Sequence, residues 1–171
     1  MYLIIFIIIF LILLTIAIAS NSLAPWVPCW SKDLKRIFAL ADLKPGEKFY
    51  DLGCGNGKTV IYAAKNFQAQ AIGIELALPL WFWCKLKQLF LQDKNIKFRW
   101  GNIFKQDFSN ADVIYVFGMP KKLQQKLKQK LEKELKQGTR VISYTFPIVG
   151  WEPVKVSKPT NRDIAVYLYR M

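Results

Sequence analysis

A glycine-rich stretch bounded by two acids is the part of this chain best suited to chemistry. An apolar run over 48–52 contains Asp51, and three glycines follow at alternate positions: Gly53, Gly55 and Gly57. Because glycine has no Cβ, backbone amides there can approach a ligand closely, and a loop between a strand and a helix points the helix N-terminus at that ligand. A second acid, Glu75, ends the next apolar run, where its carboxylate could accept from both hydroxyls of a ribose. The spacing therefore predicts a cofactor site.

The glycine spacing excludes two other ligand-binding loops. The dinucleotide fingerprint G-x-G-x-x-G would need a glycine where Lys58 stands, and a P-loop would need its first glycine at Leu52. The pattern that remains is D-x-G-x-G-x-G. An ordinary glycine-rich turn, with Glu75 a solvated acid, is the alternative. The preceding strand, the triplet and the two acids together favour the cofactor site.

The composition excludes several kinds of catalytic site. The 171-residue chain has no histidine, which removes Ser-His-Asp and Cys-His triads and imidazole metal ligands. Cys29, Cys54 and Cys84 are isolated, so the sequence predicts no disulfide framework and no metal site. The net charge of +13 would suit nucleic acid, anionic lipid or an acidic protein as partner.

The N-terminus predicts a membrane anchor. Residues 1–19 carry no charged side chain and would span roughly 28 Å as a helix, close to the hydrocarbon thickness of a bilayer. We expect a transmembrane anchor over 1–20, a juxtamembrane linker over 21–30 and one domain over 31–171. Lys32, Lys35 and Arg36 would place that domain in the cytoplasm of a single-pass protein of the cell membrane. A cleaved signal peptide ending near Ala17-Ile18-Ala19 is the alternative.

Strand and helix patterns alternate along the rest of the chain. Strand-like runs lie at about 48–52, 69–75, 96–100, 112–117, 139–146, 154–156 and 164–169. Helical spacing begins at Ser31, follows the glycine loop, and covers about 78–91 and 120–137. This alternation predicts an α/β fold with a doubly wound, mostly parallel sheet. Ligands of such sheets bind at the carboxyl ends of strands, where we expect one rim of strand-end residues: Asp51, Glu75, Asn102 and Phe117.

The D-x-G-x-G-x-G pattern with Glu75 resembles motif I of the class I, seven-strand S-adenosylmethionine (SAM) methyltransferases, which have a Rossmann-like fold. Three further segments, Pro25-Trp26-Val27-Pro28, Val116-Phe117-Gly118-Met119-Pro120 and Phe146-Pro147, resemble one branch of that superfamily. This branch is the membrane-anchored protein-lysine methyltransferases that modify the ADP/ATP carrier and the ATP-synthase c-subunit in mitochondria. The resemblance extends from Pro25 to about Trp151.

The resemblance implies roles for individual residues. Asp51 and the glycine loop would hold the methionine part of SAM, Glu75 its ribose, and Asn102 its adenine amino group. The full set expected to bind the cofactor is Asp51, Gly53, Cys54, Gly55, Gly57, Glu75, Asn102, Ile103 and Phe117. The residues expected at the reacting centre are Asp51, Phe117 and Pro120. The segment 117–120 lacks the Asn-Pro-Pro-aromatic sequence of adenine and amide methylases, which counts against nucleic acid as substrate.

Methyl transfer to lysine needs a deprotonated amine held close to the sulfonium. Apolar walls lower the pKa of a lysine, and aromatic faces hold the cation before and after transfer. Candidates for the substrate wall are Trp26, Pro28, Tyr144, Phe146 and Trp151, although each could serve only as core packing. Asp51 could act as a base only if the cofactor does not engage it fully.

A lysine-rich helix over 121–136 has two interpretations. Its leucines recur every four residues and predict a buried stripe, while its lysines could either contact anionic lipid or form a solvated face. For the whole chain, we expect a SAM-dependent protein-lysine methyltransferase that acts on a membrane-proximal protein. The alternatives are a methyltransferase of a lipid or other small amphiphile, and a non-catalytic binding module.

Overall fold

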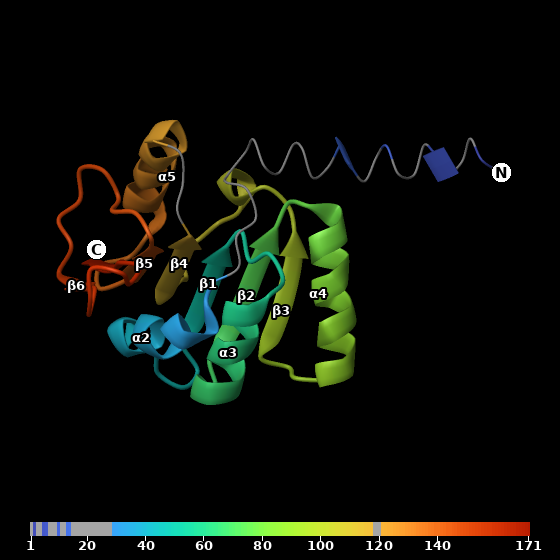
Figure 1. Cartoon of the computed structure of the whole chain (residues 1–171), viewed down its shortest axis with the longest axis horizontal. Helices are drawn as coiled ribbons and strands as arrows, with labels where there is room; N and C mark the ends of the chain where they lie inside the picture. Colours follow the sequence, from blue (N-terminus) through green and yellow to red (C-terminus); the bar gives the residue numbers. More distant parts are fainter. Residues whose placement is uncertain (1, 3–4, 7–9, 11–12, 15–28, 118–120) are drawn as a thin grey trace.

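The structure of this chain is a computed structural model, and it describes residues 2, 5–6, 10, 13–14, 29–117 and 121–171. Helices and strands alternate through most of this part (Figure 1). The elements are α2 (Ser31–Ala41), β1 (Lys48–Leu52), α3 (Lys58–Phe67), β2 (Gln70–Glu75), α4 (Leu78–Leu91), β3 (Ile96–Trp100), the short helix η1 (Ile103–Lys105), β4 (Val113–Phe117), α5 (Lys121–Glu134), β5 (Arg140–Tyr144), β6 (Lys155–Ser157) and β7 (Val166–Arg170).

The strands form a single seven-stranded sheet in the order β3-β2-β1-β4-β5-β7-β6. Strands β1 to β5 are parallel to one another, and β7 runs antiparallel to both β5 and β6. The order reverses between β1 and β4, and such a reversal opens a crevice at the carboxyl ends of the strands. The predicted Rossmann-like, mostly parallel sheet is confirmed.

Alternation of side chains along each strand divides the core between the two faces of the sheet. On one face, α2, α3 and α4 cover residues such as Phe49, Phe98 and Val113. On the other, α5 and the segment 103–111 pack against Tyr50 and Ile114. Helix α5 stands at the β4–β5 side of the domain and α4 beside β3 (Figure 1).

The register of the central strands brings the predicted site residues to one edge. Asp51 on β1 is paired with Gly73 on β2 and with Tyr115 on β4. Glu75 and Phe117 are the last residues of β2 and β4. The carboxyl ends of these strands therefore lie together, as the sequence pattern predicted.

The prediction of a membrane anchor over 1–20 is wrong, because the finding on helix length and apolarity contradicts it. A span needs about 20 consecutive apolar residues in one helix. Within the residues that the structure describes, no helix is long and apolar enough to cross a membrane. The single-pass localisation with a cytoplasmic domain depended on that anchor and is wrong with it. Most of 1–20, and residues 21–28 of the predicted linker, lie outside the described residues.

Candidate functional site

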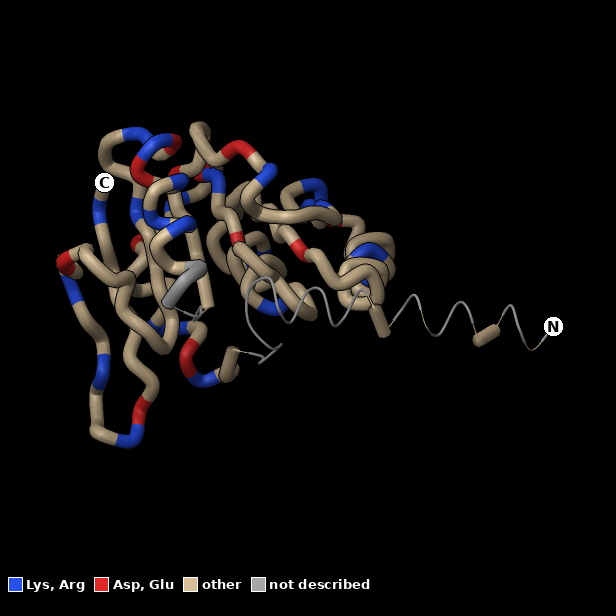
Figure 2. Tube along the Cα trace, turned by 90° about the horizontal axis from the view of Figure 1, so that it is seen from above, with Lys and Arg blue, Asp and Glu red and all other residues tan. Residues whose placement is uncertain are grey.

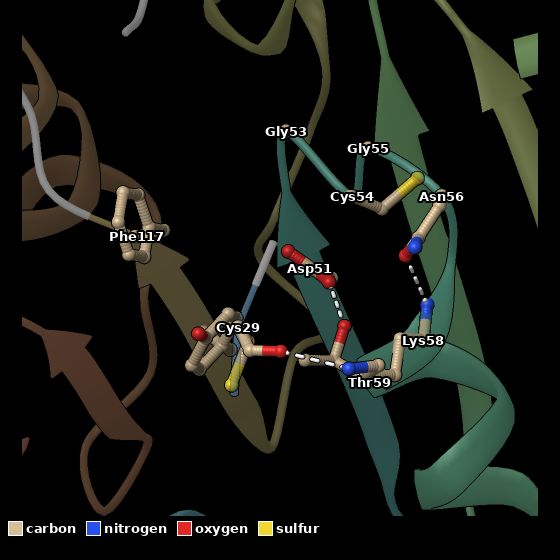
Figure 3. A pocket seen from close by; sticks show the side chains of 10 residues that line it. Cys29, Asp51, Gly53, Cys54, Gly55, Asn56, Lys58, Thr59 and Phe117 are labelled. Atoms are coloured by element: carbon tan, nitrogen blue, oxygen red, sulfur yellow. Dashed lines mark hydrogen bonds between the residues drawn. The ribbon is translucent and has the colours of Figure 1, made fainter. Parts of the chain in front are cut away.

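The loop between β1 and α3 is held in shape by its glycines and by the end of β2. Gly53, Gly55 and Gly57 have φ values of 88°, 54° and 75°, which side chains other than glycine adopt only with strain. The N–H groups of Gly53 and Cys54 both donate to Ile74 O at 2.9 Å. The loop therefore folds back over the carboxyl end of β2, with Asp51 below it (Figure 3).

Glu75 joins β2 to this loop through its carboxylate. One oxygen, Oε2, accepts from the N–H of Gly55 at 2.8 Å. The other, Oε1, accepts from the N–H groups of Leu76 at 2.9 Å and Ala77 at 2.8 Å. A carboxylate offers about four acceptor positions, so these three bonds leave roughly one for a ligand. The contact of Glu75 with ribose hydroxyls stays a prediction, in which the ribose would share the carboxylate with the loop.

Asp51 is a buried carboxylate with a single hydroxyl donor. Its side chain accepts from Thr59 Oγ1 at the start of α3 (Figure 3), and the residue is only 2% exposed. Burial raises the pKa of Asp51 to about 7, the Thr59 bond opposes that rise, and the charge of Glu75 adds to it. A cationic ligand group beside Asp51 would offset the burial of its charge.

The pocket beside Asp51 contains a tyrosine that sequence reasoning missed. Tyr115, on β4, lines it together with Asp51 and Phe117, and its buried hydroxyl has no nitrogen or oxygen partner among the described residues, with the weakly polar thiol of Cys29 as its neighbour. Burial raises the pKa of Tyr115 well above its usual value. The sequence pattern could have identified Tyr115, because residues two positions apart on a strand, such as 115 and 117, lie on the same face of β4. Tyr115 is therefore a further candidate for ligand binding.

The segment at 29–31 closes one side of the same pocket. Lys58 Nζ donates to Cys29 O at 2.9 Å and to Ser31 Oγ at 3.0 Å, and the bond to Cys29 is drawn in Figure 3. Cys29, Asn56, Lys58 and Thr59 also line the pocket. None of these four belonged to the predicted set. Asn56, Lys58 and Thr59 belong to the glycine loop and the start of α3, so the motif could have found them, whereas the position of Cys29 depends on contact between distant segments.

The aromatic residues predicted to surround the substrate lie in different parts of the structure. Phe117 lies at the pocket, and its ring centroid is 5.3 Å from that of Tyr144. Tyr144 itself is 0% exposed and donates its hydroxyl to Asp33 Oδ2 at 2.6 Å, so in this structure it is a core residue. Phe146 is 53% exposed and lies two residues beyond β5.

Trp151 contacts the opposite face of the sheet from the pocket. Its Nε1 donates to Glu132 Oε1 at 2.8 Å, and its ring lies 5.5 Å from that of Tyr169. The structure does not bring it to the pocket. The remaining predicted substrate and catalytic positions, Trp26, Pro28 and Pro120, lie outside the described residues.

Three other predicted residues border the site without lining the pocket. Gly57 is the N-cap of α3, and a Cβ there would lie 2.6 Å from the ring of Phe98. Asn102 caps η1, accepting from the N–H of Phe104 at 2.9 Å. Ile103 is buried in the core next to it. Contacts of these residues with a cofactor stay predictions.

Three lysines of α5 contact other side chains of this chain. Lys128 and Lys130 pair with Glu132 and Glu134 one turn along the helix. Lys126 Nζ lies 4.6 Å from the ring centroid of Phe104. Such intramolecular partners weaken the interpretation of α5 as a surface for anionic lipid, which remains untested.

The residues around the pocket fit SAM. Its cationic amino group suits the buried carboxylate of Asp51, and the enclosed part of the pocket, about 30 Å³, has the size of one small polar group. In the glycine loop, the missing Cβ atoms leave the backbone accessible to a ligand. Phe117 offers an aromatic face in the same pocket. When bound, SAM supplies an electrophilic methyl group on its sulfonium.

Comparisons with known proteins agree with this assignment. The profile of the ANTKMT methyltransferase domain matches residues 51–155. A protein named protein-lysine N-methyltransferase, from Saccharolobus islandicus, is 37% identical over 157 residues, which are 85% of this chain and 92% of that protein. The human lysine N-methyltransferase of the ATP-synthase c-subunit is 32% identical over 135 residues, 78% of this chain but only 56% of the relative.

A solved structure gives the same fold with the product form of the cofactor. It is described as an RNA methyltransferase from Salinibacter ruber in complex with S-adenosyl-L-homocysteine (SAH), and it is 30% identical with a TM-score of 0.78. The match covers 84% of this chain and 93% of that one. The chain therefore belongs to the ANTKMT methyltransferase domain family, and it is a SAM-dependent methyltransferase of the branch that includes the protein-lysine methyltransferases.

Proposed function

We propose that this chain transfers the methyl group of SAM to the side-chain nitrogen of a lysine in a protein. The observation that carries the proposal is the match along nearly the whole length of a protein-lysine N-methyltransferase. The pocket supports it, because a buried carboxylate and an aromatic ring face one cavity from β1 and β4. These are the groups that a cationic donor and an amine acceptor require.

Each side of the pocket has its own part in this reaction. Asp51 would pair with the amino group of SAM, and Glu75, which holds the loop, would also hold the ribose. Phe117, half-buried at the end of β4, would offer its ring to the reacting methyl group and the incoming lysine. Cation–π contact with its ring is worth about 0.5–2 kcal/mol, and alignment of donor and acceptor supplies the larger part of the rate.

The acceptor lysine loses its proton before it attacks. Burial against Phe117 lowers the lysine pKa by disfavouring the ammonium form. Asp51 is engaged by Thr59 and by the cofactor amino group, so the proton leaves to solvent. Trp26, Pro28, Phe146 and Pro120 remain candidates for the outer substrate wall.

RNA is the second candidate substrate, because the Salinibacter ruber structure is described as an RNA methyltransferase. The sequence Phe117-Gly118-Met119-Pro120 disfavours it, since it lacks the Asn-Pro-Pro-aromatic segment of base methylases. A lipid or other small amphiphile is the third. One labelling experiment separates all three classes of acceptor.

In that experiment, the full chain is incubated with methyl-labelled SAM and an extract that contains protein, RNA and lipid. We expect label in the protein fraction, released as methyl-lysine after acid hydrolysis, and abolished when the lysines of the extract are first blocked by reductive alkylation. A Glu75→Ala variant serves as the inactive control. Label confined to RNA or lipid would refute the proposal.

A further inference from the structure

A second hollow lies at the edge of the sheet opposite the glycine loop. It has a volume of about 330 Å³ and is lined by the beginnings of β1 and β2, by β3, and by the residues just before β3 and β4. Most of the lining stands at the amino ends of those strands, and Arg99 extends it along β3, whereas Asp51, Glu75 and Phe117 stand at the carboxyl ends of β1, β2 and β4 and do not line it. The hollow is therefore separate from the cofactor pocket.

Four cationic side chains line this hollow and no carboxylate does. They are Lys48, Lys94, Lys97 and Arg99. Lys94 and Lys97 are exposed, and Lys48 and Arg99 are half-buried. None of the four side chains makes an ion pair or hydrogen bond with any residue that the structure describes. Positive charge is spread over the domain (Figure 2), but here it gathers without an internal counter-charge.

The strand register places these side chains on one face. Ile72 on β2 is paired with Lys97 on β3, and Ile74 with Arg99, so both cations share the face that carries Ile72 and Ile74. Buried residues of α5 and of the segment 103–111 pack on this face of the sheet. The hollow lies over the beginnings of β1 and β2 and along β3, where Lys97 is exposed and Arg99 is half-buried.

Acids close in sequence to the lining residues are already engaged, and Glu47, next to Lys48, pairs with Arg140. Asp112 accepts from the backbone N–H of Lys48 at 2.8 Å and pairs with Lys136 Nζ at 2.6 Å. Asp93 accepts from the N–H of Asn95 at 2.9 Å. Neither lines the hollow. Like charges held this close repel one another, and a bound anion relieves the repulsion.

Uncharged donors complete the lining. Tyr50, 2% exposed, donates its hydroxyl to Asn110 Oδ1 at 2.9 Å. This bond occupies the amide oxygen of Asn110 and turns its NH₂ group toward other acceptors. Gln70 and Asn95 add further amides. Cations with convergent N–H donors are the arrangement that phosphate oxygens prefer.

We propose that this hollow binds the phosphate groups of a polyphosphorylated small molecule. Its volume lies at the lower end of the range for small-molecule sites, about 300–1,000 Å³, and the cations match a ligand with three or four negative charges. A free metabolite or an inositol phosphate headgroup of a lipid could supply the same chemistry. The site is independent of the methyl-transfer pocket.

The test is titration calorimetry of the full chain with inorganic tripolyphosphate at about 0.15 M salt. We expect saturable binding with one site per chain. The double variant Lys97→Gln with Arg99→Gln should bind at least about tenfold more weakly, because charge-assisted hydrogen bonds are lost. The matched control Lys133→Gln with Lys155→Gln removes the same net charge from exposed positions elsewhere and should change affinity less than about twofold.

Two further measurements sharpen the test. The affinity of the double variant for SAH should equal that of the original chain, which shows an intact fold. Vesicles containing phosphatidylinositol 4,5-bisphosphate, compared with soluble tripolyphosphate, tell a lipid headgroup from a free metabolite as source. Absence of saturable tripolyphosphate binding, an equal loss in both double variants, or binding of RNA alone would overturn the proposal.

Discussion

Glu75 Oε2 accepts a hydrogen bond from the backbone N–H of Gly55 at 2.8 Å, and this bond ties the last residue of β2 to the middle of the glycine loop. The two residues are 20 positions apart, and they meet because β1 and β2 are parallel neighbours. The same carboxylate thus shapes the loop and is predicted to hold the ribose of the cofactor. We therefore expect loop geometry and cofactor affinity to be coupled through one side chain.

The first prediction follows from this bond. Glu75→Ala leaves the N–H of Gly55 without its acceptor and removes the partner of the ribose. We expect SAH to bind about 1–3 kcal/mol more weakly, measured by calorimetry. Glu152→Ala, at an exposed position, is the control and should leave the affinity unchanged. Equal affinities for both variants would remove Glu75 from the cofactor site.

The second prediction separates backbone strain from crowding at two glycines. Gly57 has φ 75° and a Cβ there would lie 2.6 Å from Phe98, whereas Gly46 has φ 79° with nothing within 4 Å of a Cβ. Gly46→Ala should lower the free energy of unfolding by about 1 kcal/mol from strain alone. Gly57→Ala should lower it by about 2–4 kcal/mol, because overpacking is added. Denaturant unfolding measures both, and equal losses would show that Phe98 moves aside freely.

The third prediction concerns pH and Asp51. Its pKa in the folded chain is about 7, above the ordinary value of 3.8. Between these values the folded state binds more protons than the unfolded state, so this group makes the ligand-free protein less stable as pH rises from about 4 to 7. Asp51→Asn should abolish that decline, which is worth a few kcal/mol.

Thermal unfolding of both proteins across this pH range, without ligand, measures the difference. SAM affinity of the original chain should rise as Asp51 ionises near pH 7, because the carboxylate pairs with the ligand's ammonium. The Asn variant should bind weakly with no such rise. Parallel stability profiles for the two proteins would contradict the prediction.

The fourth prediction compares two buried tyrosines. The Tyr115 hydroxyl has the weakly polar Cys29 thiol as its neighbour and no nitrogen or oxygen partner among the described residues, while that of Tyr144 donates to Asp33 at 2.6 Å. Tyr115→Phe should leave the free energy of unfolding unchanged or raise it by about 1 kcal/mol, and should weaken SAH binding. Tyr144→Phe should lower stability by about 1.5–3 kcal/mol, because a bond to a charged group is lost.

Chemical unfolding and calorimetry with SAH together read out this comparison. The opposite pattern, in which Tyr115→Phe destabilises the protein and leaves SAH affinity intact, would show that its hydroxyl has a purely structural role. The two substitutions remove the same atom, so the difference in environment alone decides the outcome.

The amino-acid sequence by itself determined the glycine loop, the acids that flank it and the succession of strands along the chain. These features are local, because glycine spacing and apolar runs act over a few residues. Parallel strands bring their carboxyl ends to one edge, so Asp51, Glu75 and Phe117 could be placed together from sequence alone.

The groups that surround those residues became known from the folded chain. Thr59 and Tyr115 lie beside Asp51 at the pocket. The side chain of Tyr144 is buried in the core, where it donates to Asp33. Trp151 packs on the face of the sheet opposite the pocket. The cations of the second hollow come from separate strands and meet through the register of β1 to β3. Such neighbours depend on packing between distant segments, and no local pattern encodes that packing.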